Sequence, residues 1–487
     1  MPVTKTSTTS GIGPFGGSTD SRARALRPPG EPGVARDPSA RERGIALMLT
    51  LSAIAILAVV IADMHQNTGT SYALAATQRD RLRAEYMARS GVNLSRLLIA
   101  NEEGIRQQVR PIYQAMLRRE PPQIPVWSYA NQVLEPFCNF EAAQDSGLND
   151  FSIATGLGDT HGTCEILAFA ENSKLNLNNP LHMAGDAGRL NVGMQVFAMT
   201  GGYQAPSPFD TLFERRDGDG QITTRLDIVS ALVDWWDFDA QRTVFDPGAA
   251  QVDSNAGAED NIYSSFRDPY QVKNAPFDSL EELRYIRGVT DDFWATFVEP
   301  DPEDPSSRAL TIYGSGRVHL NEARAEVLLA RTCSILVTQP LCTDPTEAAK
   351  FIQIINTARA MAPIPWFSSH EDYARFLEGG GSGTELRPML ESILGADNPL
   401  LPRAVTVSAQ DRQMFRRVFV TSAGIIFVQS TGRVGNCGMN PGDEDRPGRC
   451  TQLRIRSVLN FDRPWTPPPP NAGTMPRMGI FHYWRVE

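Results

Sequence analysis

The feature that most constrains this fold is an uncharged apolar run over residues 45–62, which charged residues bracket on both sides. As a helix the run would be roughly 27 Å long, close to the thickness of a bilayer's hydrocarbon layer. Its two polar side chains, Thr50 and Ser52, can bond to carbonyls of their own helix. The run is therefore predicted to cross a membrane once. Basic residues outnumber acidic ones before it, which favours a cytoplasmic N-terminus and a non-cytoplasmic remainder.

Three fates are open to such a run: a cleaved secretory signal, a plain anchor, or a segment cut at its N-terminal side. A secretory signal needs a small-residue cleavage site soon after the run, whereas Ala73-Leu74-Ala75 lies well downstream. The junction Arg41-Glu42-Arg43-Gly44 resembles that of type IV prepilins and pseudopilins. Gly44 adds no side chain, so an extended backbone could enter a protease cleft there. The resemblance implies that prepilin peptidase cuts between Gly44 and Ile45, with methylation of the new N-terminus.

Composition limits the remaining function classes. A chain of 487 residues can form two or three domains, and its net charge of −10 argues against nucleic acid as a partner. With six histidines and no Cys-x-x-Cys spacing, a zinc site is not expected. The cysteines instead favour disulfides in an oxidising compartment, here the periplasm. Six cysteines allow fifteen connectivities, of which the sequence-local one pairs Cys138 with Cys164, Cys333 with Cys342, and Cys437 with Cys450.

The predicted order of segments follows from local patterns. Residues 1–44 have almost no aliphatic content and are expected to be disordered. This segment either has a role of its own or reflects the choice of start site. Residues 45–120 predict a long helix, broken near Gly104, and residues 121–180 include short strands, among them 151–154, 164–170 and one around Leu175 and Leu177. Residues 181–400 are mostly helical, with helices expected over 225–236, 279–287, 291–298, 322–336, 345–360 and 370–378. Residues 401–487 predict strands over 403–409, 416–422, 424–429 and 452–461.

Acidic residues concentrate between positions 210 and 299, which hold nineteen acids and eight bases. The stretches Asp234-Trp235-Trp236-Asp237-Phe238-Asp239 and Gly257-Ala258-Glu259-Asp260 lie on either side of a loop that contains Asp246 and Asp253. Such carboxylates repel one another unless a cation neutralises them, and oxygen ligands without His or Cys favour calcium. A solvated acidic loop and a glycosidase-like carboxylate pair are the alternatives.

A second possible calcium loop is Asp217-Gly218-Asp219-Gly220-Gln221, which begins like an EF-hand. It lacks an acid at the fifth position, and its twelfth position is Ile228 instead of Glu. An Asp/Gly turn is the simpler interpretation.

Residues 280–290 and 318–323 resemble helix-hairpin-helix elements, the second of them like those of competence DNA receptors. Such hairpins bind phosphate through backbone N–H groups at a Gly-containing turn. Here Thr290 replaces the second glycine and the flanks are acidic, which would repel DNA. We therefore expect the packing unit to be kept and the phosphate chemistry to be lost.

A longer series of motifs is similar to protein K of the type II (general) secretion pathway, the large minor pseudopilin. The resemblance rests on the Gly44 junction, Leu175-Asn176-Leu177-Asn178, the two acidic stretches, Leu280-Glu281-Glu282-Leu283 and Leu320-Asn321-Glu322-Ala323. Leu49, at the fifth mature position, also fits, since this family lacks the Glu that most pilins carry there. Trp236, the long N-terminal tail and the proline run 467–470 depart from the family pattern.

The resemblance implies an α+β fold: a long N-terminal transmembrane helix and a pilin-like α/β domain with a large, mostly helical inserted domain. It also implies one or two Ca²⁺ ions, with Asp237, Asp239, Glu259 and Asp260 as ligands, to which the predicted set adds Asp253 of the loop.

The implied function is to cap the tip of a pseudopilus and initiate its assembly, without enzymatic activity. The implied partners are minor pseudopilins I and J, through them H and the major pseudopilin, and prepilin peptidase. The protein would be a single-pass protein of the bacterial inner membrane with its bulk in the periplasm. A minor pilin of a type IV pilus and a membrane-anchored DNA receptor are the alternatives.

Overall fold

The computed structural model describes residues 38–118, 120–138, 162–178, 185–213, 216, 220, 222–253, 257–361, 365–381, 385–395, 398–435, 437, 450–462 and 478–487. The chain forms two compact units, Met1–Leu74 and Ala75–Glu487. The predictions for the N-terminal tail before residue 38, the strand candidate 151–154, the acids Asp217 and Asp219, and the proline run lie outside the described residues.

Helix α1 (Pro38–Ala100) contains the apolar run and is long and apolar enough to cross a membrane. Its side chains from Ile45 onward are exposed throughout the run. The hydroxyls of Thr50 and Ser52 donate to the carbonyls of Leu47 and Leu49, each at 2.9 Å, so no polar group in the run is left without a partner within the helix. The helix is interrupted at Asn101, and the chain continues as α2 (Glu102–Leu117).

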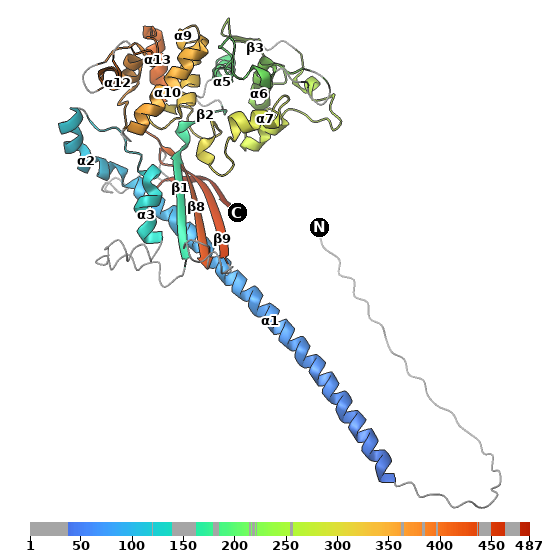
Figure 1. Ribbon diagram of the computed structural model, residues 1–487. Coiled ribbons are helices and arrows are strands. Elements are labelled where there is room, and N and C mark those ends of the chain that lie inside the picture. Colours follow the sequence, from blue (N-terminus) through green and yellow to red (C-terminus); the bar gives the residue numbers. More distant parts are fainter. Residues whose placement is uncertain are drawn as a thin grey trace, which may run out of the picture. The chain divides into compact units, whose positions relative to one another are not determined.

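A four-stranded antiparallel sheet forms the lower part of the second unit in Figure 1. Its order is β1 (Gly162–Ala170), β8 (Ile425–Gly435), β9 (Cys450–Asn460) and β10 (Ile480–Val486). Because β1 pairs directly with β8, the residues from 171 to 424 intervene between two neighbouring strands. The mixed fold with a mostly helical insertion is therefore confirmed, whereas the exact domain boundaries stay predictions.

One face of the sheet packs on the last part of α1, where Ala84, Ala88 and Val92 are buried against residues of β8 and β9. Small residues permit this contact. A Cβ added at Gly432 would lie 2.0 Å from the carbonyl oxygen of Ala84, so only glycine lets the strand come this close to the helix. The outer edge of β1 is covered by η1 (Val126–Tyr129) and α3 (Ala130–Cys138).

The inserted region contains helices and short strand pairs, with its own core. Its α-helices are α5 (Asp186–Met199), α6 (Arg225–Trp236), α7 (Asp291–Phe293), α8 (Ala325–Cys333), α9 (Pro340–Thr343), α10 (Pro345–Met361), α11 (His370–Leu377), α12 (Leu386–Leu394) and α13 (Ala409–Val418). Its short strands pair as β2 (Leu175–Asn176) with β5 (Leu310–Thr311), β3 (Val244–Asp246) with β4 (Gln251–Asp253), and β6 (Val318–His319) with β7 (Phe419–Val420).

The structure corrects several predicted elements. Residues 403–407 form no strand, although Val405 and Val407 are buried. The prediction over 416–422 is wrong for its first residues because α13 occupies them, started by a capping box between Ser408 and Asp411. The helix predicted over 279–287 is a 3₁₀ helix, η6 (Leu280–Tyr285), and the one over 291–298 is α7 followed by a π turn (Trp294–Val298).

Three disulfides join Cys138 to Cys164, Cys333 to Cys342, and Cys437 to Cys450. The sequence-local pairing is thus confirmed among the fifteen possible ones. The first bridge connects α3 to β1 and fixes the helix that covers this edge of the sheet.

Candidate metal centre

Helix α6 supplies two of the three acids that converge in the inserted region. The helix begins at a capping box in which Thr224 and Asp227 each bond to the other's backbone N–H. From Ile228 to Trp236 all of its residues are buried, which fixes its position in the core. Asp234 lies in the last turn and Asp237 is the C-cap. A helix C-terminus carries partial negative charge, so carboxylates are unfavourable there and a cation is favoured.

The third acid, Glu259, begins the short helix η5 (Glu259–Ile262). Backbone hydrogen bonds hold this segment against the chain that leaves α6. The N–H of Arg242 donates to the Gly257 carbonyl at 2.8 Å, and the N–H of Glu259 donates to the Ala240 carbonyl at 3.4 Å. Gly257 has a φ of +104°, which suits glycine, and Tyr263 anchors the end of the turn in the core.

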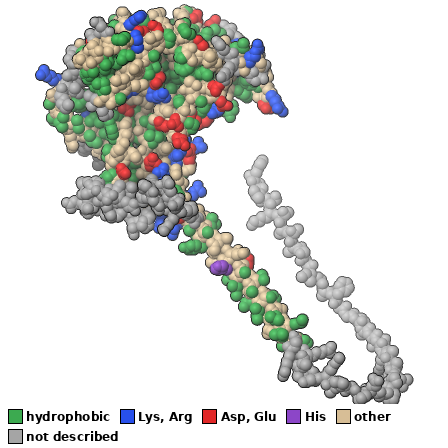
Figure 2. Space-filling model, in the orientation of Figure 1, with side chains coloured by type: hydrophobic (Ala, Val, Ile, Leu, Met, Phe, Trp, Pro, Cys, Tyr) green, Lys and Arg blue, Asp and Glu red, His purple; other side chains and the backbone are tan. Residues whose placement is uncertain are grey.

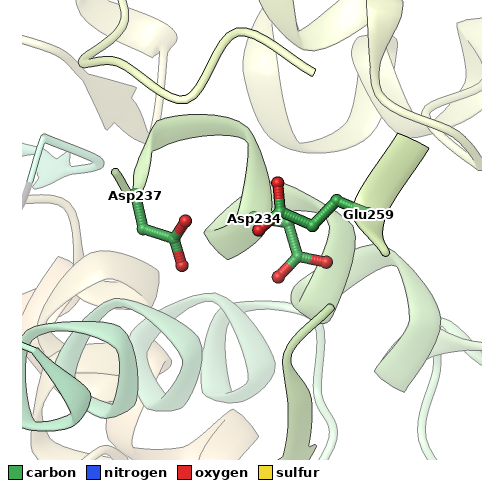
Figure 3. Close-up of side chains that lie close together, drawn as sticks. All are labelled: Asp234, Asp237 and Glu259. Atoms are coloured by element: carbon green, nitrogen blue, oxygen red, sulfur yellow. The ribbon is translucent and has the colours of Figure 1, made fainter. Parts of the chain in front are cut away.

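Asp234, Asp237 and Glu259 each place an oxygen within 4.8 Å of the other two (Figure 3). Their exposed fractions are 1%, 3% and 1%, so water scarcely reaches them. Figure 3 shows the carboxyl groups of Asp234 and Glu259 directed toward one another, with that of Asp237 beside them. Three buried carboxylates this close would repel strongly if all were charged.

Several carboxylate oxygens of the cluster accept no hydrogen bond. One Asp234 oxygen accepts from the N–H of Thr243 at 2.8 Å, but its other oxygen and both Glu259 oxygens accept no hydrogen bond. Among the described residues, one ion pair reaches the cluster: Nε of Arg189, on α5, is 2.8 Å from an oxygen of Asp237, whereas Arg242 acts on Asp234 only through longer-range attraction. A single guanidinium does not balance three carboxylates, and orphaned buried oxygens of this kind suit a bound cation.

The pKa values of the three acids reflect the same excess of negative charge. Burial, followed by repulsion from Asp234 and Asp237, raises the pKa of Glu259 to about 9. Burial is also the main reason that the pKa of Asp234 rises to about 7 and that of Asp237 to about 6. Without a metal ion, the cluster therefore takes up protons near neutral pH. With a divalent ion, the same oxygens would be held in their charged form.

The donor set fits calcium. The cluster consists only of carboxylate oxygens, and Ca²⁺ takes six to eight oxygen ligands in flexible geometry. Asp234, Asp237 and Glu259 could each supply one or two of them.

Of the predicted ligands, the structure brings together Asp237 and Glu259. Asp239 bonds to the guanidinium of Arg189, which also pairs with Asp237, and Asp260 accepts the N–H of Val272 at 2.9 Å. Neither belongs to the group of three, and their role as ligands stays a prediction. Asp253 lies exposed at the end of β4.

The predicted ligand list omitted Asp234, although its acidic stretch was recognised. The spacing of Asp234 and Asp237 could have indicated this, because residues three apart lie on the same side of a helix.

The hairpin-like segments serve packing. Glu282 accepts the indole N–H of Trp235 at 3.2 Å and pairs with Lys273 at 2.9 Å, so it helps to position α6. In the second segment, Asn321 exchanges two hydrogen bonds with the backbone of Phe367. These acids and amides hold neighbouring segments of the inserted region together.

Comparison with known proteins agrees with this organisation. The family model described as type II secretion system (T2SS), protein K, matches residues 173–298, the segment that contains α6 and all three acids. A search of curated proteins finds no match. Among solved structures, the GspK-GspI-GspJ complex from the type 2 secretion system of enterotoxigenic Escherichia coli is similar at 11% identity, with a TM-score of 0.36. The match covers 73% of this chain and 97% of that one.

Residues 173–298 are thus similar to a component of type II secretion systems. The matching model is that of protein K, so the match confirms the resemblance seen in the sequence over this segment.

Proposed function

We propose that this minor pseudopilin caps the tip of a periplasmic pseudopilus and initiates its assembly, and that it is not an enzyme. The observation that carries the proposal is the protein K match over residues 173–298, in a chain whose α1 contains one membrane-spanning run. The three disulfides support placing the part that follows the run in the oxidising periplasm.

Leu49 supports a position at the end of the filament. It lies in the apolar run at the fifth position after Gly44, where pilins that stack on one another carry a Glu. That acid is thought to pair with the N-terminus of a neighbouring subunit, and an acid without its partner is costly in lipid. In a subunit with no neighbour above it, such an acid would have no N-terminus with which to pair.

The insertion supports the same position. Residues 171–424 leave and rejoin the sheet between β1 and β8, adding a large helical body to one pilin-like subunit. Such a body would obstruct a further subunit on top of it, which suits a cap and does not suit a repeating subunit.

We expect minor pseudopilins I and J to be its partners, because the similar solved structure is a complex of GspK with GspI and GspJ. A type IV minor pilin would share the leader and the apolar helix. Co-purification of the full chain with the I and J proteins of its own system, without pilus subunits, distinguishes the two functions.

Processing at Gly44 provides the direct test. In Gly44→Val, the β-branched side chain should exclude the junction from the peptidase, so that the precursor stays uncut and secretion is lost. Gly69→Val is the matched control, since position 69 is also in α1 and has no atom within 4 Å of an added Cβ. Precursor size on a gel and secreted protein in the medium are the measurements. An uncut precursor with normal secretion would contradict the proposed function.

We also propose that Asp234, Asp237 and Glu259 bind calcium in the periplasm. The ion would join the C-terminus of α6 to the start of η5, and would thereby stabilise the loop between them. The support for this is the set of orphaned buried oxygens at the cluster.

A further inference from the structure

An arginine of α5 lies beside the acid cluster and is held there by other carboxylates. Nε of Arg189 is 2.8 Å from an oxygen of Asp237, and its other two guanidinium nitrogens pair with Asp239 and, at 3.0 Å, with Asp186. The side chains of Asp186 and Asp239 are 70% and 40% exposed, whereas that of Asp237 is 4% exposed. Two carboxylates that do not belong to the group of three therefore fix the guanidinium next to it.

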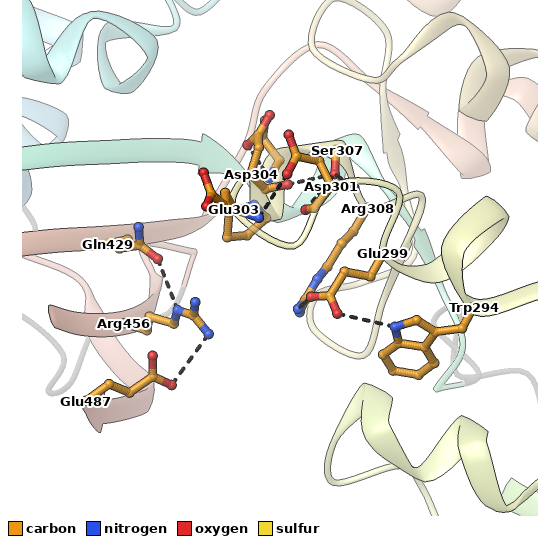
Figure 4. A network of polar contacts seen from close by, with 12 residues as sticks. Trp294, Glu299, Asp301, Glu303, Asp304, Ser307, Arg308, Gln429, Arg456 and Glu487 are labelled. Carbon is orange, nitrogen blue, oxygen red and sulfur yellow. Dashed lines mark hydrogen bonds and ion pairs between the residues drawn. The ribbon is translucent and has the colours of Figure 1, made fainter. Parts of the chain in front are cut away.

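The contact with Arg189 leaves the oxygens of Asp237 available to an ion. The pair is close, but neither oxygen of Asp237 accepts a well-aligned hydrogen bond. Glu299 shows the contrast (Figure 4): Arg308 bonds to one of its carboxylate oxygens, and the indole N–H of Trp294 donates to the other at 3.2 Å. Arg189 thus supplies positive charge beside Asp237 without satisfying its oxygens.

The wider surroundings of the cluster favour a cation. Residues 210–299 contain nineteen acids and eight bases. On the visible face of the inserted region, acidic and basic side chains are interspersed (Figure 2). Salt screens such surface charges within roughly 10 Å, but screens a charge in contact with a buried carboxylate much less. Among the described residues, Arg189, with its side chain 11% exposed, is therefore the cation placed to oppose a bound ion most strongly.

We propose that Arg189 is the affinity-setting residue of the calcium site, a fixed counter-charge that supports the cluster before calcium binds and weakens the binding of the ion. In the metal-free protein, the guanidinium attracts Asp237 and offsets part of the repulsion among the three acids. Once calcium is bound, the same guanidinium, kept in place by Asp186 and Asp239, repels it. The charge around a calcium site tunes its affinity, and an interaction that favours the free site over the bound one lowers that affinity. The inference rests on the proposed calcium site and adds what determines its affinity.

Arg189→Gln tests this inference, because it removes the charge and keeps a polar side chain. The detergent-solubilised full chain is titrated with calcium in an isothermal titration calorimeter. We expect the variant to bind calcium about tenfold more tightly than the wild type. Arg189→Lys keeps the charge and should bind within about threefold of the wild type.

Arg225→Gln is the matched control for the loss of an ion pair. Arg225 lies at the start of α6, has a side chain that is 14% exposed, and pairs with Asp210 at 2.8 Å. It is separated from Asp234 by roughly 14 Å along the helix axis. We expect Arg225→Gln to unfold at a lower temperature than the wild type but to bind calcium with the same affinity.

Thermal unfolding distinguishes the proposed role of Arg189 from a purely structural one. In excess chelator, Arg189→Gln should unfold at a lower temperature than the wild type, because the three acids have lost their counter-charge. In saturating calcium this difference should shrink, since the variant binds the ion more tightly. A purely structural arginine would lower both unfolding temperatures equally, as we expect for Arg225→Gln.

Unchanged or weaker calcium binding by Arg189→Gln, while the wild type binds, would overturn the inference and leave the calcium site and the proposed function intact. A wild type that binds no calcium would overturn the inference and the calcium site together, but not the proposed role at the tip. Should Arg189→Gln fail to fold in chelator, the calcium-loaded variant is mixed with a fluorescent chelator and the release of the ion is followed. Release starts from the folded, loaded state, so the lost repulsion should slow it about tenfold. Equal or faster release would overturn the inference.

Discussion

In excess chelator, the full chain should unfold roughly 5 to 10 °C below its unfolding temperature in millimolar calcium. The reason is that a ligand that binds only the folded state stabilises it, and the acid cluster exists only when α6 and η5 are in place. Without the ion, Asp234, Asp237 and Glu259 remain buried with orphaned oxygens. Differential scanning calorimetry of the detergent-solubilised protein measures the difference.

The same cluster predicts how this difference depends on pH. In the absence of metal, the folded-state pKa of Glu259 is raised from 4.5 to about 9, so its protonated form stabilises the fold at low pH. That stabilisation is complete below about pH 4.5 and is lost as the pH rises toward 9. The raised pKa values of Asp234 (about 7) and Asp237 (about 6) act in the same direction, and their contributions are lost as the pH rises through those values. Calcium requires the charged form, so the gap between calcium and chelator should widen from pH 5 to pH 8.

Two variants distinguish calcium binding at the cluster of Asp234, Asp237 and Glu259 from binding at the other ligands predicted from the sequence. Glu259→Gln keeps the size of the side chain and removes its charge, and should reduce the chelator effect to about 1 °C. Asp253→Asn removes a predicted ligand that lies outside the cluster, and should leave the effect unchanged. A chelator effect that survives Glu259→Gln, or disappears in Asp253→Asn, would show that calcium binds elsewhere.

The sequence predicted the features that depend on local pattern. The apolar run, the disulfide pairs and the helix over residues 225–236 follow from neighbours within a few turns or a short loop. The acidic stretches on both sides of the loop were recognised in the same way, and two of the five predicted ligands meet in the cluster.

What the sequence did not predict depends on distant partners. The sequence did not indicate that Arg189 on α5, fifty positions earlier in the chain, would pair with Asp239, whose role as a ligand stays a prediction. The β-prone pair Thr406 and Val407 suggested a strand over 403–409, but Val405 and Val407 are buried in irregular chain, because packing alone can satisfy an apolar side chain. Neither outcome can be read from neighbouring residues.

The contact between α1 and the sheet is likewise long-range, and it leads to a prediction about Gly432 of β8. A Cβ at this position would lie 2.0 Å from the Ala84 oxygen and 2.7 Å from the Ala88 nitrogen. Both are backbone atoms of a helix, so a change of side-chain rotamer cannot relieve the overlap. The helix must move away from the sheet, and the core around Ala88 and Val92 then loses contact.

Gly432→Ala should therefore destabilise the protein by about 3 kcal/mol, which corresponds to a fall of roughly 10 °C in unfolding temperature. The same substitution at Gly104 of α2 is the control, because an added Cβ has no atom within 4 Å there. Alanine is the better helix former, so Gly104→Ala should be neutral or stabilise the protein by up to about 1 kcal/mol. Equal unfolding temperatures for the two variants would mean that the helix does not pack this closely on the strand. Since α1 also contains the membrane run, a loosened contact should reduce secretion even where the mature protein accumulates normally.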